Sequence, residues 1–148
     1  MAAPYAAHRA QMKAILLGWG MREAHAETTA EILGWADLHG VDSHGISMLP
    51  VYDGLRRAGR ARMDAEPEIL RETGVSALVD GGGGLGHVPA DRAMRTAIAK
   101  AQSAGIGVVV VRNSAHFGAV GYYTELAATA GLIGMGATSA SGIQVAPT

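Results

Sequence analysis

The sequence has no cysteine among its 148 residues, so it forms no disulfide bond and offers no thiolate as nucleophile or metal ligand. It also lacks an excess of charge of one sign. Its 12 Lys and Arg residues face 13 Asp and Glu residues, which leaves no basic surface to hold nucleic acid or anionic lipid. The longest apolar run, near residues 108–111, is far too short to cross a bilayer, and residues 1–13 lack the basic-then-apolar order of a signal peptide. These absences predict a soluble, cytoplasmic protein with no nucleic-acid or membrane partner.

Aromatic residues are scarce, at 5%, whereas glycine is abundant: its 21 residues are about double the ordinary share. Glycine at this density indicates close approaches of the backbone, either to a ligand or between packed elements, or else a chain rich in loops. The length is that of one domain, sufficient to bury a core of its own.

Residues 1–60 are predicted to be mainly helical. Small and apolar residues recur there at helical spacing, at Ala26, Thr29, Ala30, Leu33 and Ala36. Residues 41–50 interrupt this pattern, and Pro50 marks the start of a new helix.

Residues 61–148 are predicted to form an α/β part, with alternating strands and helices in a mixed sheet. The expected elements are strands at 68–73 and 75–80, a helix at 89–105 that ends at Gly105, a strand at 106–112 buried on both faces, a helix at 118–131 and a strand at 132–140. The last residues, SGIQVAPT, follow the final strand in mid-turn. This ending predicts a fold that is cut short, with a short native terminus as the alternative.

The glycine cluster GGGGLG spans residues 81–86, between a predicted strand and a predicted helix. Three of its glycines fit the dinucleotide-binding pattern G-x-G-x-x-G, namely Gly81, Gly83 and Gly86. The acidic residue expected about 20 positions later is missing, although Arg112 could meet a 2′-phosphate in its place. Because any run of four glycines fits this pattern easily, a tight turn with close packing is the favoured interpretation.

A second motif is Asp42-Ser43-His44-Gly45, at the end of the predicted helical region. Histidine titrates near neutral pH, so His44 could exchange the proton when a ketone and an alcohol interconvert. The alternative is a helix cap, in which Asp42 or Ser43 satisfies free amides and His44 is a surface residue.

A third motif, residues 113–118, lies where a predicted strand ends and a helix begins, the side of an α/β sheet where ligands usually bind. His116, next to Phe117 and two small residues, is there either a partly desolvated acid/base or a satisfied core histidine.

Other chemistries find no support in the sequence. The six histidines form no H-x-x-x-H pair and have no carboxylate at ligand spacing, so we expect no metal site. Neither a G-x-S-x-G nucleophile turn nor a Walker A motif is present.

The stretch ADLHGVDSHGISMLPVYDGLRRAG, together with VRNSAHFGAVGYYTELAATAGLIGMGATSAS and VAPT, closely resembles the malate/L-lactate dehydrogenase family, which includes ureidoglycolate and sulfolactate dehydrogenases. The pairing of a DSHG block with an HFG block in this order and at this separation is specific, and the resemblance runs essentially from end to end. It implies hydride transfer between NAD(P)H and a small 2-oxo acid or 2-hydroxy acid. It also implies a family-specific fold that is not the Rossmann fold, and a homodimer or larger homo-oligomer.

The resemblance also implies site residues. His116 and His44 match the two histidines at the reacting carbon, and His116 is the first choice as proton donor. Ser43 matches a residue on the substrate side, beside His44. On the cofactor side, the resemblance implies His116, Gly118, Thr138, Ser139 and Ser141.

Two departures from the family pattern stand out. Many members carry a carboxylate-binding arginine four residues after the first histidine, where this sequence has Met48, and Arg56 or Arg57 is a possible replacement. Family chains also continue past VAP, and the rest builds most of the cofactor pocket, so we expect this chain to be the N-terminal portion of the fold. The rival interpretations are an inactive truncated paralogue that acts as a binding or assembly module, and a Rossmann-type NADP-binding domain.

Overall fold

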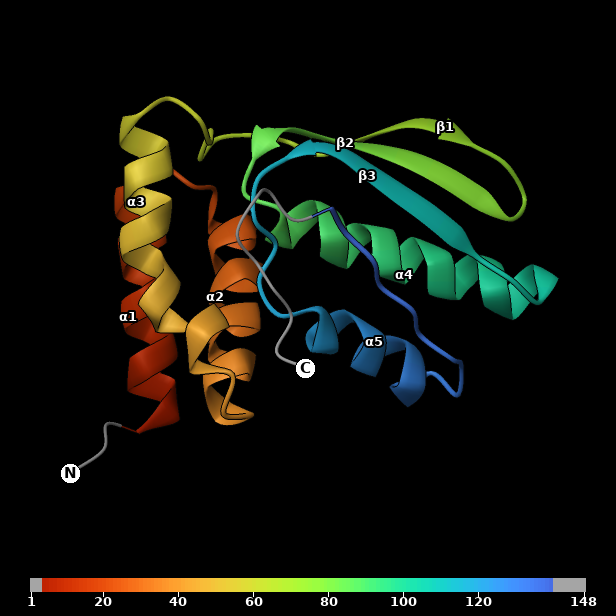
Figure 1. Cartoon of the computed structure of the whole chain (residues 1–148), viewed down its shortest axis with the longest axis horizontal. Helices are drawn as coiled ribbons and strands as arrows, with labels where there is room; N and C mark the ends of the chain where they lie inside the picture. Colours follow the sequence, from red (N-terminus) through yellow and green to blue (C-terminus); the bar gives the residue numbers. More distant parts are fainter. Residues whose placement is uncertain (1–3, 140–148) are drawn as a thin grey trace.

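The computed structural model of the chain describes residues 4–139. Its elements are helices α1 (Tyr5–Gly18), α2 (Glu23–Leu38), α3 (Leu49–Arg57), α4 (His87–Ala104) and α5 (Val120–Thr129), short 3₁₀ helices η1 (Asp42–His44) and η2 (Ile46–Met48), and strands β1 (Glu68–Glu72), β2 (Ser76–Gly84) and β3 (Val108–Ser114). Helices α1 to α3 stand side by side, the sheet forms a separate layer, and α4 and α5 lie on one side of that sheet (Figure 1). Within residues 4–139, no helix is long and apolar enough to cross a membrane.

The sheet is mixed, as the α/β pattern predicted, and its strand order is β1-β2-β3. Strand β1 pairs antiparallel with β2, and β2 pairs parallel with β3 through helix α4. Helix α4 ends at Gly105, which adopts the left-handed conformation with φ +82°, so the predicted glycine stop is confirmed. Pro50 lies in the first turn of α3, where proline's missing N–H costs nothing.

The prediction that strand 106–112 is buried on both faces was wrong. Val108 and Val110 of β3 are each more than half exposed, while the alternate residues Val109 and Val111 are partly buried. The reason is position. Among the described strands β3 pairs with β2 alone and lies at the edge of the sheet, with α4 packed on one side only.

The predicted strand at 132–140 is also absent over its described residues, which have no regular structure. This segment folds back along α5. A Cβ on Gly134 would collide with Thr124, and one on Gly136 would collide with Val120. The glycines thus let the backbone approach the helix closely.

Helix α2 lies between two hydrophobic clusters. Leu33 packs into a cluster with α1 and α3 that includes Met12 and Tyr52. The adjacent Ile32 packs into a second cluster with Tyr123 of α5. Successive residues of a helix point in different directions, so one helix can join the α1–α3 group to the α4–α5 layer. This arrangement places the start of α3 beside the loop after β3.

Candidate functional site

The turn that carries His44 is held by Asp37, near the end of α2. The Asp37 carboxylate accepts a hydrogen bond from the Ile46 amide at 3.0 Å and pairs with His8 of α1 at 2.8 Å. A Cβ on Gly45 would occupy the same space as this carboxylate. Glycine at position 45 therefore lets the turn close over Asp37, which places His44 on the side facing the sheet loops.

The alternative interpretation of this turn as a side-chain cap does not hold. The helix that starts there has Val41 at its N-cap, without a side-chain hydrogen bond. The Ser43 hydroxyl lies instead 2.9 Å from Nδ1 of His44. Ser43 is exposed and His44 is half-buried, so both are accessible to a small molecule.

The loop that carries His116 is fixed by backbone hydrogen bonds to the glycine cluster. The Ala115 amide donates to the Gly84 carbonyl at 2.8 Å, and the Gly86 amide donates to the His116 carbonyl at 2.9 Å. Asn113 enters the loop at φ +52°, a conformation that asparagine tolerates better than most residues, and its amide group donates to Asp80.

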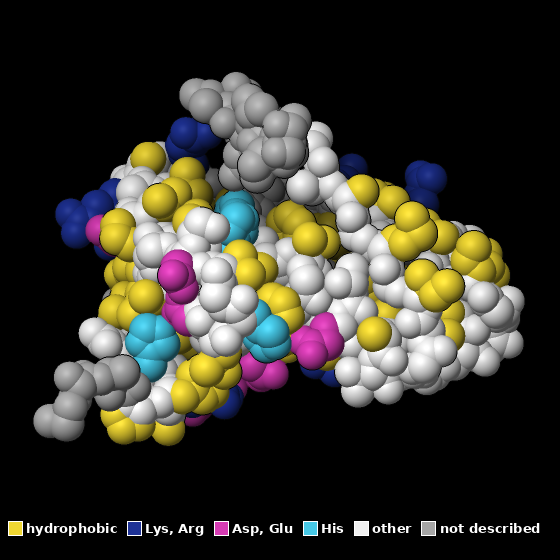
Figure 2. All heavy atoms as spheres, turned by 60° about the horizontal axis from the view of Figure 1, so that its bottom comes forward, with side chains coloured by type: hydrophobic (Ala, Val, Ile, Leu, Met, Phe, Trp, Pro, Cys, Tyr) yellow, Lys and Arg dark blue, Asp and Glu magenta, His cyan; other side chains and the backbone are white. Residues whose placement is uncertain are grey.

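The structure brings the two predicted histidines together. The ring centroids of His44 and His116 lie 5.3 Å apart, with the ring planes inclined by 34°. Both side chains are half-buried, and Figure 2 shows histidine side chains reaching the surface on the half of the molecule formed by the N-terminal helices. Two imidazoles at this separation can contact a single small substrate.

Two further polar residues, not singled out from the sequence, complete the cluster. The Tyr52 hydroxyl lies 2.8 Å from Nδ1 of His116 and 3.3 Å from Nε2 of His87. The Gly118 amide also donates to Nδ1 of His116, at 3.2 Å. Tyr52 and His87 are both fully buried. The available sequence signals were a tyrosine in the first turns after Pro50 and a histidine directly after the glycine cluster.

The electrostatics of this cluster favour neutral side chains. Burial lowers the pKa of His116, and the nearby His44 lowers it further. Burial, with a smaller contribution from His116, lowers the pKa of His87 to about 3. Burial also raises the pKa of Tyr52. At neutral pH, His116, His87 and Tyr52 therefore form an uncharged hydrogen-bonded group.

The glycine cluster serves packing. Gly82 and Gly83 have φ of +64° and +75°, a Cβ on Gly81 would collide with Ser114, and one on Gly86 would collide with Phe117. The Gly86 amide, directly before α4, is bonded to the loop of His116, and Gly86 and His87 are both buried. These contacts favour the structural interpretation over a pyrophosphate cradle.

The residues expected on the cofactor side have different outcomes. Gly118 lies in the His116 loop with φ +79°, and a Cβ there would lie 3.1 Å from both His87 and Ile32. Thr138 and Ser139 are exposed and form no hydrogen bond with another described residue. Ser141 lies outside the described residues.

The substrate-carboxylate arginine has no clear replacement. Met48 packs against the α1–α3 cluster. Arg56 and Arg57 both pair with Asp53, and the Arg56 guanidinium lies 5.6 Å from the ring centroid of Trp19. Arg112, considered for a 2′-phosphate, pairs with Asp80 at 2.9 Å.

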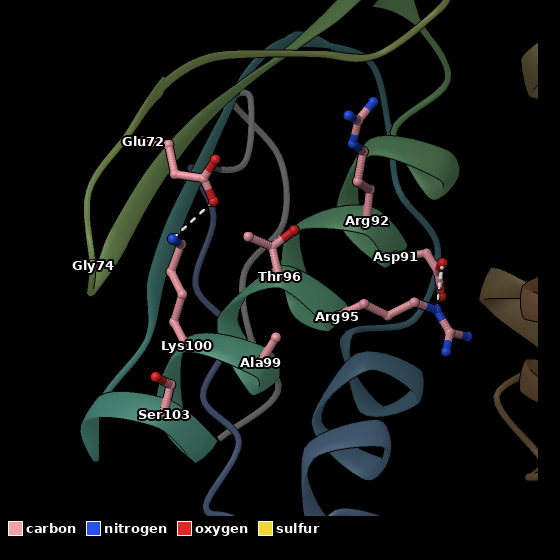
Figure 3. Close-up of a pocket in the computed structure, with 9 residues that line it drawn as sticks. All are labelled: Glu72, Gly74, Asp91, Arg92, Arg95, Thr96, Ala99, Lys100 and Ser103. Carbon is pink, nitrogen blue, oxygen red and sulfur yellow. Dashed lines mark hydrogen bonds and ion pairs between the residues drawn. The ribbon is translucent and has the colours of Figure 1, made fainter.

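An open groove between α4 and the β1–β2 turn lies apart from the histidines (Figure 3). Four of its ionic side chains form two pairs: Lys100 with Glu72 at 2.9 Å, and Arg95 with Asp91 at 2.8 Å. Arg92 donates to the carbonyl of Pro67. Four of the five charged side chains of the groove are thus paired and Arg92 binds a backbone carbonyl, which leaves few free charges for a charged ligand.

Residues 4–139 contain no group of three or more His, Asp or Glu side chains arranged to hold a metal ion.

Comparison with known proteins gives one consistent family. Residues 3–148 match the malate/L-lactate dehydrogenase family. A malate dehydrogenase from Pyrococcus horikoshii is 42% identical over 135 residues, which are 90% of this chain and 37% of that protein. An NAD(+) ureidoglycolate dehydrogenase from Escherichia coli O157:H7 is 39% identical over 118 residues, 78% of this chain and 33% of its own length. The crystal structure of malate dehydrogenase from Entamoeba histolytica superposes with a TM-score of 0.84 at 40% identity, covering 88% of this chain and 37% of that one.

Proposed function

The chain belongs to the malate/L-lactate dehydrogenase family, and we propose that it carries the proton-handling part of an NAD(P)-dependent dehydrogenase for small 2-hydroxy acids. The observation that supports this most directly is the pair of accessible imidazoles of His44 and His116, whose ring centroids lie 5.3 Å apart. The chain spans little more than a third of the length of the relatives that it matches, so the complete activity is itself part of the proposal.

The reaction divides into a hydride transfer and a proton transfer. When bound, NAD(P)⁺ supplies the acceptor for the hydrogen on C2 of the substrate, which leaves with its electron pair. The hydroxyl proton is released from the oxygen as the C=O bond forms, and in the reverse direction the developing alkoxide takes up a proton. A histidine suits this step because its pKa lies near neutral pH.

In this proposal each residue has a place. His44 and His116 face the substrate oxygen, and Ser43 lies beside His44 on the substrate side. On the cofactor side we place His116, Gly118, Thr138, Ser139 and Ser141. The relative from Escherichia coli is named for NAD(+), which supports a pyridine nucleotide without deciding between NAD and NADP for this chain.

The described residues fit only one end of such a cofactor. The imidazole pair suits the reacting end. At the start of α4, where backbone amides could hold phosphates, the Gly86 amide is already bonded to the His116 carbonyl, and Gly86 and His87 are buried. We therefore place the phosphate-binding groups outside residues 4–139.

We also propose that the protein is cytoplasmic and works as a homodimer or larger homo-oligomer. Ile133 and Met135 are 94% and 87% exposed, and apolar side chains are exposed at many points of the face shown in Figure 2. Apolar side chains exposed in this way favour association. Light scattering coupled to size exclusion tests this, and a monomer at all concentrations would contradict it.

A chimera tests the catalytic proposal. The chain replaces the matching segment of the Pyrococcus horikoshii malate dehydrogenase, and turnover is measured with malate, lactate and ureidoglycolate, using NAD⁺ and NADP⁺. We expect turnover, and a loss of about 10²–10⁴-fold in kcat on replacing His44 or His116 by Ala. His39→Ala, at an exposed histidine outside the pair, is the control. A folded chimera that binds cofactor but oxidises none of these acids would instead support a binding or assembly module.

A further inference from the structure

The hydrogen-bond partners of His116 determine which of its nitrogens carries the hydrogen. The Gly118 amide is a backbone N–H, which can only donate, and it points at Nδ1 at 3.2 Å. Nδ1 must therefore present a lone pair, and the hydrogen of the neutral ring must lie on Nε2. The Tyr52 hydroxyl, 2.8 Å from the same Nδ1, can then only donate as well.

The same reasoning extends to His87. Since the Tyr52 hydrogen points to His116, the Tyr52 oxygen is free to accept, and Nε2 of His87 lies 3.3 Å from it. His87 then carries its hydrogen on Nε2, and its buried Nδ1, which has no partner among the described residues, is a lone pair. A buried acceptor without a partner is tolerated better than a buried donor without one, so this set of directions is the consistent one.

From this series of hydrogen bonds, and resting on the proposed function, we propose that Tyr52 is a positioning residue. It holds His116 neutral with the ring hydrogen on Nε2, from which His116 can donate a hydrogen bond to the substrate oxygen. The three groups act in order: His87 donates to Tyr52, Tyr52 donates to His116, and His116 presents Nε2–H outward. A second proton on Nδ1 would face the hydrogens of both Gly118 and Tyr52, which disfavours the charged ring. Burial and the neighbouring His44 act in the same direction.

The Nδ1 atom of His44, unlike that of His116, faces a group that can either donate or accept. This atom faces the Ser43 hydroxyl at 2.9 Å, and a hydroxyl can donate or accept by rotating. His44 can therefore gain or lose a proton without breaking this bond. We assign the proton exchanged with the substrate to His44, and the polarising hydrogen bond to His116. A neutral imidazole that polarises a carbonyl is an established catalytic device.

The experiment is a nitrogen-15 NMR measurement on the 148-residue chain, which requires no turnover. Two-bond proton–nitrogen spectra of the imidazoles report which nitrogen carries the hydrogen, with His→Gln variants for assignment. We expect the Nε2–H form for both His116 and His87 at neutral pH. In Tyr52→Phe the Nδ1 resonance of His116 should move, and the pKa of His116 should rise by roughly 0.5–1 unit, because a hydrogen bond to the neutral form is lost.

Tyr122→Phe is the matched control. It removes another buried tyrosine hydroxyl, bonded to Glu31 at 3.2 Å, without touching either imidazole. It should leave the His116 spectrum and pKa unchanged. A His116 hydrogen on Nδ1 in the wild-type chain overturns the proposal, and so does a folded Tyr52→Phe variant with an unchanged His116. The wild-type spectrum decides the tautomer even if Tyr52→Phe does not fold. An inactive chimera would contradict the proposed function and leave this measurement intact.

Discussion

The carboxylate of Asp37 occupies the space that a side chain on Gly45 would fill. Two hydrogen-bonding partners, His8 and the Ile46 amide, hold that carboxylate in place, so it cannot easily move aside. The position of His44, the residue before Gly45, therefore depends on a contact between the end of α2 and the turn that follows it.

Replacing Gly45 by Ala is expected to destabilise the chain by about 1–3 kcal/mol, because the added methyl group displaces a half-buried carboxylate that has two hydrogen-bonding partners. Gly54→Ala is the control. Gly54 is exposed in the middle of α3 with open space around it, so alanine there should stabilise by roughly 0.5–1 kcal/mol. Urea unfolding of the two variants measures whether the free energy of unfolding falls in Gly45→Ala and rises in Gly54→Ala. Equal effects would show that the Asp37 contact contributes little.

The division of tasks between the histidines predicts a difference between glutamine variants. Glutamine keeps an N–H donor but cannot exchange a proton near neutral pH. In the chimera, His116→Ala should lose about 10²–10³-fold in kcat, as expected for one lost donor to a developing oxyanion, and His116→Gln should recover part of this. His44→Gln should remain as impaired as His44→Ala. Recovery at position 44 in place of position 116 would reverse the assignment.

His87 predicts a pH dependence of stability. Its pKa is lowered to about 3 in the folded chain, so the unfolded chain binds this proton more readily. The stabilisation is present above the unfolded pKa of about 6.5 and is lost as the pH falls toward 3, by at most about 1.4 kcal/mol per pH unit. In His87→Gln this part of the slope should disappear. Urea unfolding midpoints between pH 7 and 4 measure this pH dependence. The same dependence in the wild-type chain and in His87→Gln would contradict the lowered pKa of His87.

Cofactor affinity gives a further prediction. Because the Gly86 amide is bonded to the His116 carbonyl and Gly86 and His87 are buried, titration calorimetry of the 148-residue chain with NADH or NADPH should show no binding in the micromolar range. The chimera, which contains the rest of the fold, is the positive control. Micromolar binding by the chain alone would show that its own residues build a complete pocket.

Much of the fold could be predicted from local signals. Helix α4 was visible because its apolar spacing ends at a glycine that adopts the left-handed conformation. The strand at Val108–Ser114 was visible from its β-branched residues, but its burial was not. Apolar composition indicates a strand, whereas its place in the sheet depends on which strands pair beside it. The segment after α5 shows the same limit, because the contacts of Gly134 and Gly136 with the helix have no local signature.

The site, like the fold, could be predicted only where the local sequence carries a signal. His44 and His116 lie in short motifs at element boundaries, so they could be selected from the sequence. Tyr52 and His87 could not be selected in this way. A tyrosine on an amphipathic helix usually belongs to the core, and only the three-dimensional arrangement shows that its hydroxyl joins two imidazoles.

A Cβ on Gly118 would lie 3.1 Å from both His87 and Ile32, and the Gly118 amide donates to His116. A larger residue there would separate helices α2 and α4 and, in the same movement, turn the donor away from Nδ1. Conformational stability and imidazole basicity are thus coupled through one backbone position. Variants selected at this position for thermal tolerance alone should therefore change the basicity of His116 as well.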